Sequence, residues 1–350
     1  MLRTILCLAG AVAVAGCGAS TTAAAPTNPP EIETRPETRA FRDWRAVCDN
    51  GGDCFAFGRA GPEVTGFVRI HMPAGPAGEP VVSVGAWGAD GADAFQLSID
   101  GQTRRIVIPP EEQGSDVGEI QGPAARDLIR ALAGGRTMQL TAGTESGNVS
   151  LSGVSAALLW IDERQGRLDT VTALLRGGAR PASEVPAAPE LPVIRARPAV
   201  ISSQGPGDRP TLPESIARRP EIAACRDGWG DLPEGGDVLF HDLGPDREVW
   251  GVQCYLAAYN TGHILFLSGR DGANPRPLIL DGVDEPVEIF TNVDVGWSIA
   301  NNVRGRGLGD CGLIQEWRWA VRGFELTSER RMEECWGMPP DLWPTLWRTR

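Results

Sequence analysis

The sequence contains no lysine, and only three histidines and two tyrosines among its 350 residues. All 33 basic residues are therefore arginine, which we attribute to codon bias in a GC-rich genome rather than to a functional arginine surface. None of His71, His241 and His263 lies in a zinc-ligand spacing such as HExxH, so we predict no metal site. Acidic residues number 45, and this excess argues against nucleic-acid binding, which needs a basic surface.

A long apolar run is also missing. The apolar stretch from Ile5 to Val14 is shorter than the roughly 20 residues that span a bilayer, and Arg3 before it completes the pattern of a cleaved export signal. The sequence VAGC that ends at Cys17 resembles the bacterial lipobox, in which the cysteine becomes the first mature residue and is acylated. We expect residues 1–17 to be a lipoprotein signal peptide; an ordinary secretory signal is the alternative.

The segment that follows is typical of a tether. Residues 18–40 are rich in Ala, Thr, Pro and Glu and contain almost no large apolar side chain, which predicts a flexible chain. Gly18 stands where the inner-membrane retention signal has Asp, so an outer-membrane lipoprotein with periplasmic domains is favoured. The expected membrane contact is the lipid anchor at Cys17.

Six cysteines remain after Cys7 in the signal and the acylated Cys17 are set aside. An even number in an exported protein predicts disulfides. Sequence order favours Cys48 with Cys54, Cys225 with Cys254, and Cys311 with Cys335, although the last four cysteines allow three pairings. The DNGGD loop between the first pair lacks the ligand spacing of an EF-hand, so we predict a turn rather than a calcium site.

Nine prolines between Pro181 and Pro220 divide the chain, so we expect domains at 41–178 and 221–350 with a Pro-rich linker at 179–220. The first contains short apolar runs such as CFAFGR, GFVRIH and AFQLSI, and two helical stretches, PAARDLIRALAGG and a longer one from Ser155 to Leu175. Short strands with turns between them and segregated helices predict an α+β, mainly β domain with an antiparallel sheet.

The second domain is predicted to be all-β, because it contains further short strands such as HILFLS and no long amphipathic helix. It is rich in tryptophan: Trp229, Trp250, Trp297, Trp317, Trp319, Trp336, Trp343 and Trp347. We expect most of these indoles in the core, since each brings a large apolar surface. A carbohydrate or peptide platform built from two or three of them is the alternative.

The candidates for catalysis are few. Ser155 lies in GVSAA, which mimics a nucleophile elbow, but Ala157 stands where the elbow has glycine, and Asp242 and His263 lie in the other predicted domain. We predict that Ser155 caps the helix that follows it. The run GLGDCG at 307–312 satisfies GxGxxG, yet a strand rather than a helix is expected after it, so we predict no dinucleotide or other cofactor.

The sequences FRDWRAVCDN, LSGVSAALLWIDERQGRLDTVTALL, CYLAAYN, RGLGDCGLIQEWRW and DLWPTLWRT resemble the bacterial family called domain of unknown function 1176, over about residues 41–350. This resemblance implies an exported protein and supplies no catalytic residues. The first domain is also similar to the invasion-associated locus B family, through its Trp, its two early cysteines and the LSGVSAAL segment. That similarity implies a β-sandwich-like domain and favours a binding module.

The sequence thus predicts a non-enzymatic envelope lipoprotein whose domains bind an envelope protein or a cell-wall partner. The alternative is a periplasmic hydrolase using Ser155, or carboxylates such as Asp162 and Glu163, which are adjacent on a helix and point apart. A third interpretation is a spacer or inhibitor that presents the tryptophans of the second domain.

Overall fold

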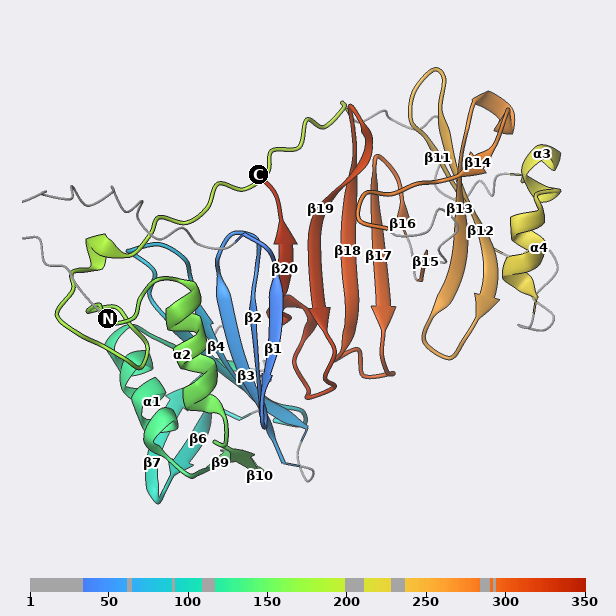
Figure 1. Ribbon diagram of the computed structural model, residues 1–350. Helices are drawn as coiled ribbons and strands as arrows, with labels where there is room; N and C mark the ends of the chain where they lie inside the picture. The colour runs from blue at the N-terminus through green and yellow to red at the C-terminus, as the bar shows by residue number, and fades with distance from the viewer. Residues whose placement is uncertain are drawn as a thin grey trace, which may run out of the picture.

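The computed structural model describes residues 34–61, 65–89, 92–108, 117–198, 211–227, 237–283, 290–291 and 294–350. The predicted signal, Cys17 and residues 18–33 of the predicted tether lie outside the described residues, whereas residues 37–40 of that tether belong to the first strand. The described residues form three β-sheets, which lie side by side in Figure 1 with helices beside the first and the third. In the part of the chain that the structure describes, no helix is long and apolar enough to cross a membrane.

The first sheet confirms a mainly β protein with antiparallel strand pairing. Its strands are β1 (Glu37–Phe41), β2 (Trp44–Cys48), β3 (Cys54–Ala60), β4 (Gly66–Met72), β5 (Val81–Ala86), β6 (Ala94–Ile99), β7 (Gln102–Val107), β8 (Val117–Gln121), β9 (Thr137–Ala142) and β10 (Glu145–Ser150). The order is β7-β6-β9-β10-β3-β4-β5-β8, with β2 and then β1 also paired onto β3. The end strands β7 and β8 contact each other, so the sheet is nearly closed.

Two helices cover this sheet. Helix α1 (Gly122–Gly134) forms where PAARDLIRALAGG predicts it, and it buries Leu128, Ile129 and Leu132 at helical spacing. Helix α2 (Val154–Arg164) packs against β1, β2 and β3 and buries Leu158, Trp160 and Ile161. Both apolar faces join the core that the inward side chains of the sheet form.

The prediction that the second helix extends to Leu175 is wrong, because α2 ends at Arg164. Gly166 adopts a left-handed conformation with φ 66°, and the amide of Arg167 donates to the carbonyl of Asp162, which closes the helix C-terminus. The chain then folds back over the helix. The carboxylate of Asp162 accepts the amides of Leu174 and Leu175 at 2.7 and 3.0 Å, so this return is part of the core.

The second and third sheets are formed by the C-terminal part of the chain. The second contains β16 (Asp294–Val295), β17 (Ser298–Arg304), β18 (Gly312–Ala320), β19 (Gly323–Met332) and β20 (Thr345–Arg348), in that order. The third contains β11 (Val238–Asp242), β12 (Glu248–Leu256), β13 (Thr261–Ser268), β14 (Arg276–Pro277) and β15 (Phe290–Thr291). Leu265 and Phe290 from the third sheet, and Leu280 from the segment after β14, pack on Trp317 and Phe324 from the second. These two sheets therefore share one core.

Short helices cover the far face of the third sheet. Helices α3 (Glu214–Ala217) and α4 (Pro220–Arg226) place Ile216, Ile222 and Cys225 against Trp250 and Phe266. The prediction of an all-β region from residue 221 onward missed α4, because seven residues with only two buried side chains show no helical period in the sequence.

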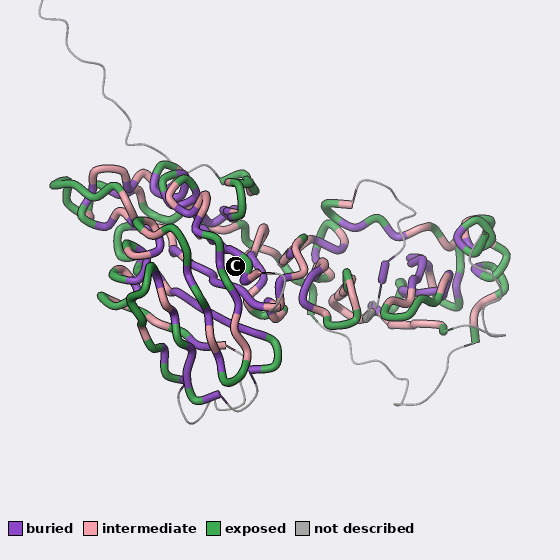
Figure 2. Tube along the Cα trace, turned by 90° about the horizontal axis from the view of Figure 1, so that it is seen from below, coloured by how far each residue is buried: buried purple, intermediate pink, exposed green. Residues whose placement is uncertain are grey.

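Strand β3 is buried on both faces, and this joins the two parts of the protein. Ala56 faces the core of the first sheet, while Phe55 and Phe57 face a second cluster that includes Trp336 and Trp343. Figure 2 shows buried stretches along the strands of both parts and exposed residues on the loops. Burial of one phenylalanine contributes about 1.5–3 kcal/mol, so this contact holds the second sheet against the first.

The described part of the predicted linker lies along both parts of the protein. Val185 is buried, and the amide of Ile194 donates to the carbonyl of the C-terminal Arg350. Farther on, the amide of Arg197 donates to the carbonyl of Trp319 on β18. Figure 1 shows this segment passing the C-terminus on its way to the hairpin of β18 and β19. The division into domains at 178 and 221 stays a prediction.

Three disulfides are present, and they are the pairs that sequence order favours. Cys48 bonds Cys54 across the hairpin of β2 and β3, Cys225 ties α4 to β12 through Cys254, and Cys311 bonds Cys335 beside β18. Each joins an element to a neighbour that it already contacts. The pairing therefore secures local packing rather than the contact between the two parts of the protein.

We expect Gly153→Ala to destabilise the protein much more than Gly143→Ala. Both glycines have positive φ angles, 106° and 56°, which cost a side-chain-bearing residue about 1–2 kcal/mol. A Cβ at Gly153 would also stand 1.7 Å from the carbonyl oxygen of Phe41, whereas one at Gly143 would meet nothing within 4 Å. Urea denaturation should show a further loss of about 2 kcal/mol for Gly153→Ala; equal losses would contradict this account of α2.

Candidate functional site

Ser155 does not occupy the position of a catalytic nucleophile. Gly153, not Ser155, is the N-cap of α2, and the prediction that Ser155 caps the helix is wrong. The serine lies two residues after the cap, because Gly153 lies against the backbone of Phe41. Its hydroxyl donates to the carbonyl of Ala133 at 2.9 Å, which ties α2 to the end of α1.

The other members of the hypothetical triad lie far from Ser155. Asp242 is on β11 and forms an ion pair with Arg270 at 2.7 Å, while His263 is buried in β13. Figure 1 places these two strands at the opposite end of the row of sheets from α2. The structure therefore brings no base to the serine from the residues that the sequence singled out.

The two adjacent carboxylates have separate surroundings. Asp162 is buried and accepts three backbone amides, whereas Glu163 is exposed. Desolvation raises the pKa of Asp162 above its ordinary value, although those amides oppose the shift. The structural bonds of Asp162 explain its burial without a catalytic role.

The GLGDCG run forms a turn between β17 and β18. Arg306 and Asp310 form a two-point ion pair across it, and the amide of Gly337 donates to Asp310 at 2.7 Å. A strand follows at Gly312, so the amides have no helix behind them to hold a pyrophosphate. Asp310 also lies beside the Cys311–Cys335 pair, whose sulfurs are bonded to each other rather than available as thiolate ligands.

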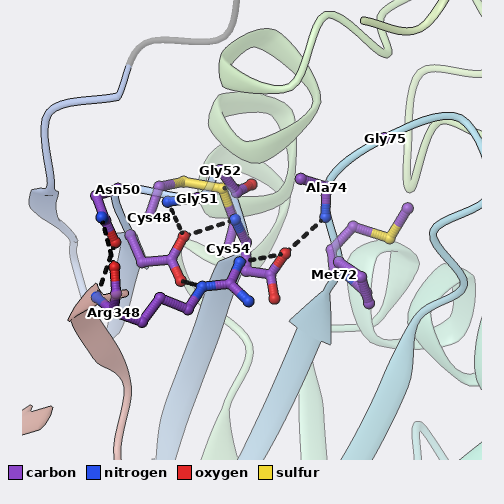
Figure 3. Close-up of polar contacts among 12 residues, drawn as sticks. Cys48, Asn50, Gly51, Gly52, Cys54, Met72, Ala74, Gly75 and Arg348 are labelled. Carbon is purple, nitrogen blue, oxygen red and sulfur yellow. Dashed lines mark hydrogen bonds and ion pairs between the residues drawn. A yellow bond between two sulfur atoms is a disulfide. The ribbon is translucent and has the colours of Figure 1, made fainter. Parts of the chain in front are cut away.

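The DNGGD loop forms the predicted turn, and the C-terminal strand docks on it (Figure 3). Asn50 exchanges two hydrogen bonds with the backbone of Arg348, at 2.9 and 3.0 Å. The guanidinium of Arg348 lies 2.7 Å from Asp49 Oδ2 and 3.1 Å from Asp53 Oδ1. The positive charge at these carboxylates thus comes from the other end of the chain.

Hydrogen bonds extend from the loop toward α2. Gln165 donates to the carbonyls of Gly52 and Met72, and Arg167 donates to the side-chain oxygen of Gln165 at 2.7 Å. Arg167 is fully buried and also donates to the carbonyls of Pro73 and Gly75. This network satisfies a buried guanidinium and amide, and it fixes the loop relative to the helix.

The two aspartates of the loop have opposite pKa shifts. Burial raises the pKa of Asp49 from 3.8 to about 6, although Arg348 and two amide hydrogen bonds oppose the shift. Burial acts in the same direction on Asp53, but hydrogen bonds from His71 and Ala74 together with Arg348 outweigh it, so the pKa of Asp53 is lowered. The carboxylate deepest in the contact between β20 and the loop is therefore the one that titrates nearest to neutral pH.

The described residues also form an open groove of about 570 Å³ between the second and third sheets. One wall is formed by β14 and the residues just after it, and it contains Arg276 and Ile279. The other wall is the β18–β19 hairpin with Val321 and Arg322. The floor of the groove is apolar and consists of Leu278, Trp319 and Phe324. Leu278 and Phe324 are buried, and Trp319 is half-buried. This volume lies within the range of about 300–1,000 Å³ that is usual for small-molecule sites.

The groove is positively charged in an acidic protein. Four arginines line it, Arg197, Arg247, Arg276 and Arg322, against a single acidic residue, Asp246. Arg322 forms an ion pair with Glu325, whereas the guanidinium groups of the other three have no carboxylate partner among the described residues. Arg197 is held in place by the carbonyl of Ala320 at 3.0 Å and by the ring of Trp319, whose centroid is 5.4 Å away.

Comparison with known proteins places the chain in a family. The family described as "Protein of unknown function (DUF1176)" matches residues 38–350 of this chain. The chain belongs to this family. The resemblance found in the sequence is thus confirmed, over nearly the whole chain.

Two individual proteins are also similar to this chain. The uncharacterized protein YpfG of Escherichia coli (strain K12) is 28% identical over 342 residues, which cover 90% of this chain and 94% of that protein. The crystal structure of invasion associated protein B from Bartonella henselae matches with 18% identity and a TM-score of 0.29, over 37% of this chain and 99% of that one. A TM-score of that size carries no conclusion about fold or function.

Sequence reasoning missed the arginine groove of this DUF1176 protein. Its cationic residues lie at 197, 247, 276 and 322, on four separate segments, and no spacing relates them. The absence of lysine favours codon bias as the reason for the arginines, and the exposure of Val321 beside Arg322 is a property of the folded hairpin rather than of the sequence.

We expect Asp49→Asn to remove part of the pH dependence of stability. A carboxyl whose folded pKa is raised from 3.8 to about 6 contributes stability below pH 4 that is lost as the pH rises through 6. About two pKa units correspond to about 3 kcal/mol. Urea titrations at pH 4 and pH 7 should therefore show wild type gaining about 2.4 kcal/mol over the variant toward acid pH.

The exposed Asp127 on α1 provides the control, because Asp127→Asn removes a carboxylate without changing the contact with Arg348. An Asp49→Asn difference that does not change between pH 4 and pH 7 would contradict the assignment.

Proposed function

We propose that this chain is an exported lipoprotein of the cell envelope, anchored through Cys17, that binds an envelope component without catalysing a reaction. The observation that carries the proposal is the open arginine-lined groove, which offers four cations and an apolar floor. A site with that lining suits the recognition of an anionic ligand, since guanidinium groups bond carboxylate and phosphate in a fork. The outer membrane is the favoured location, on the strength of Gly18.

Two further features support an exported binding protein. Three disulfides suit an oxidising compartment. The sequence before Cys17 resembles a lipobox, and the tether predicted after it would allow the folded part to reach a partner.

The hydrolase remains the alternative, and no observation favours it over binding. Ser155 and Asp162 make structural hydrogen bonds, and Glu163 is exposed on the helix surface. The third interpretation, a module that presents tryptophans, also gains little: Trp250, Trp317, Trp336 and Trp343 are buried, Trp297, Trp319 and Trp347 are half-buried, and Trp229 lies outside the described residues.

Cys17→Ser provides the direct test of the anchor. The wild-type protein should fractionate with the outer membrane and incorporate radiolabelled palmitate, whereas the variant should carry no label and leave the membrane fraction. Cys7→Ser is the matched control, because that cysteine lies inside the predicted signal and should have no effect. Label on both variants would contradict acylation at Cys17.

The binding role is tested by crosslinking in living cells followed by affinity recovery and mass spectrometry. We expect the anchored protein to recover a specific envelope component that the Cys17→Ser protein does not. Turnover of an envelope substrate by the purified protein, abolished by Ser155→Ala but not by Ser152→Ala, would overturn the non-catalytic role and establish the hydrolase.

A further inference from the structure

Three arginines with no carboxylate partner in the described chain line the same groove. Arg247 follows β11, Arg276 begins β14, and Arg197 lies beside β18, yet all three line the same hollow. The guanidinium of Arg247 donates only to a backbone carbonyl, that of Asp246 at 3.1 Å, and the guanidinium of Arg276 has no hydrogen-bond partner within the described ranges. The guanidinium groups are therefore available to an external anion, and the protein's overall charge of −12 makes this local excess stand out.

The rim of the groove is unusually apolar for an exposed surface. Ile279 and Val321 are 69% and 63% exposed, the two highest values among the large apolar side chains described as exposed. They lie on opposite walls of the hollow, one after β14 and one at the tip of the β18–β19 hairpin. An exposed apolar patch next to arginine is typical of surfaces that meet the interface of an anionic membrane.

We propose that this groove binds the headgroup of an anionic phospholipid, with the phosphate on Arg247 and Arg276 and the rim residues Ile279 and Val321 in the acyl boundary. The inference rests on the proposed role as an envelope binding protein and names its ligand. A soluble acid would satisfy the guanidinium groups but would leave both rim side chains in water. A phospholipid accounts for the charge and the exposed apolar rim together.

The groove lies far from the point where the predicted tether joins the folded part of the protein. The predicted tether joins the first sheet at β1, whereas the groove lies between the second and third sheets. Figure 1 shows the three sheets side by side, with the first and third at opposite ends of the row. A headgroup in the groove therefore adds a second membrane contact at a distance from the anchor and lays the row of sheets along the bilayer.

The test is co-sedimentation of residues 18–350, which lack the anchor cysteine Cys17 and so carry no acyl group, with vesicles of phosphatidylglycerol or of phosphatidylcholine; the disulfides are formed beforehand. We expect at least tenfold stronger partition to phosphatidylglycerol. Because each arginine near an anionic surface contributes about a fivefold factor, the Arg247→Gln/Arg276→Gln protein should bind roughly 25-fold more weakly. Ile279→Ser/Val321→Ser should weaken binding severalfold.

Matched controls come from exposed residues elsewhere on the protein. Arg59→Gln/Arg136→Gln removes two exposed arginines, one on β3 and one just before β9, and Val107→Ser/Val171→Ser removes side chains that are 55% and 59% exposed. All four variants change exposed side chains, so circular dichroism and melting temperatures should match wild type. Controls that lose as much binding as the groove variants would overturn the proposal.

Other results would also decide the question. Equal partition to both kinds of vesicle, or no partition to phosphatidylglycerol, would overturn the lipid site. Free glycerol 1-phosphate that binds as tightly as the vesicles, with no effect of the rim variants, would show a soluble-anion site instead. These outcomes leave the envelope role intact if crosslinking still recovers a partner, so the failure of the lipid site and the failure of the proposed function are distinguishable.

Discussion

The structure depends on the neutralisation of a buried carboxylate. Asp49 lies in a hairpin loop with almost no exposure, and the charge that faces it is carried by Arg348 near the other end of the chain. Asn50 completes the contact by pairing with the backbone of the same arginine. Removal of one partner from such a pair leaves an uncompensated charge, which is costly in a buried site. The loop therefore favours a single position for β20, and with it for the second sheet.

The aromatic cluster beside this ion pair stabilises the contact between the first and second sheets, and the ion pair fixes their relative position. Phe55 and Phe57 meet Trp336 and Trp343 over a surface that apolar burial alone would allow to slide. The hydrogen bonds to Arg348 and the network through Gln165 and Arg167 are directional, so they select one arrangement. The arginine groove lies on the far side of the same second sheet, between it and the third sheet, so its walls are held by a packed core rather than by loops alone.

Much of the local structure was predictable. The strands at CFAFGR, GFVRIH, AFQLSI and HILFLS appear where alternation and β-branched residues predict them, and α1 appears with its expected buried face. Two of the errors share a cause. Helix α2 stops at Arg164 because Asp162 captures amides twelve or more residues later, and Ser155 is displaced from the cap by the contact of Gly153 with Phe41. Both are tertiary contacts, which no window of sequence contains.

The sequence by itself determined the strands, the first helix, the even set of cysteines and the family, because these follow from short-range periodicity, composition and motif. The tertiary structure alone decided which charges meet. Asp49 finds Arg348 across 298 intervening residues, and four arginines from separate segments gather in one groove. Charge pairing depends on distance in space and on burial, and neither quantity is set by position along the chain.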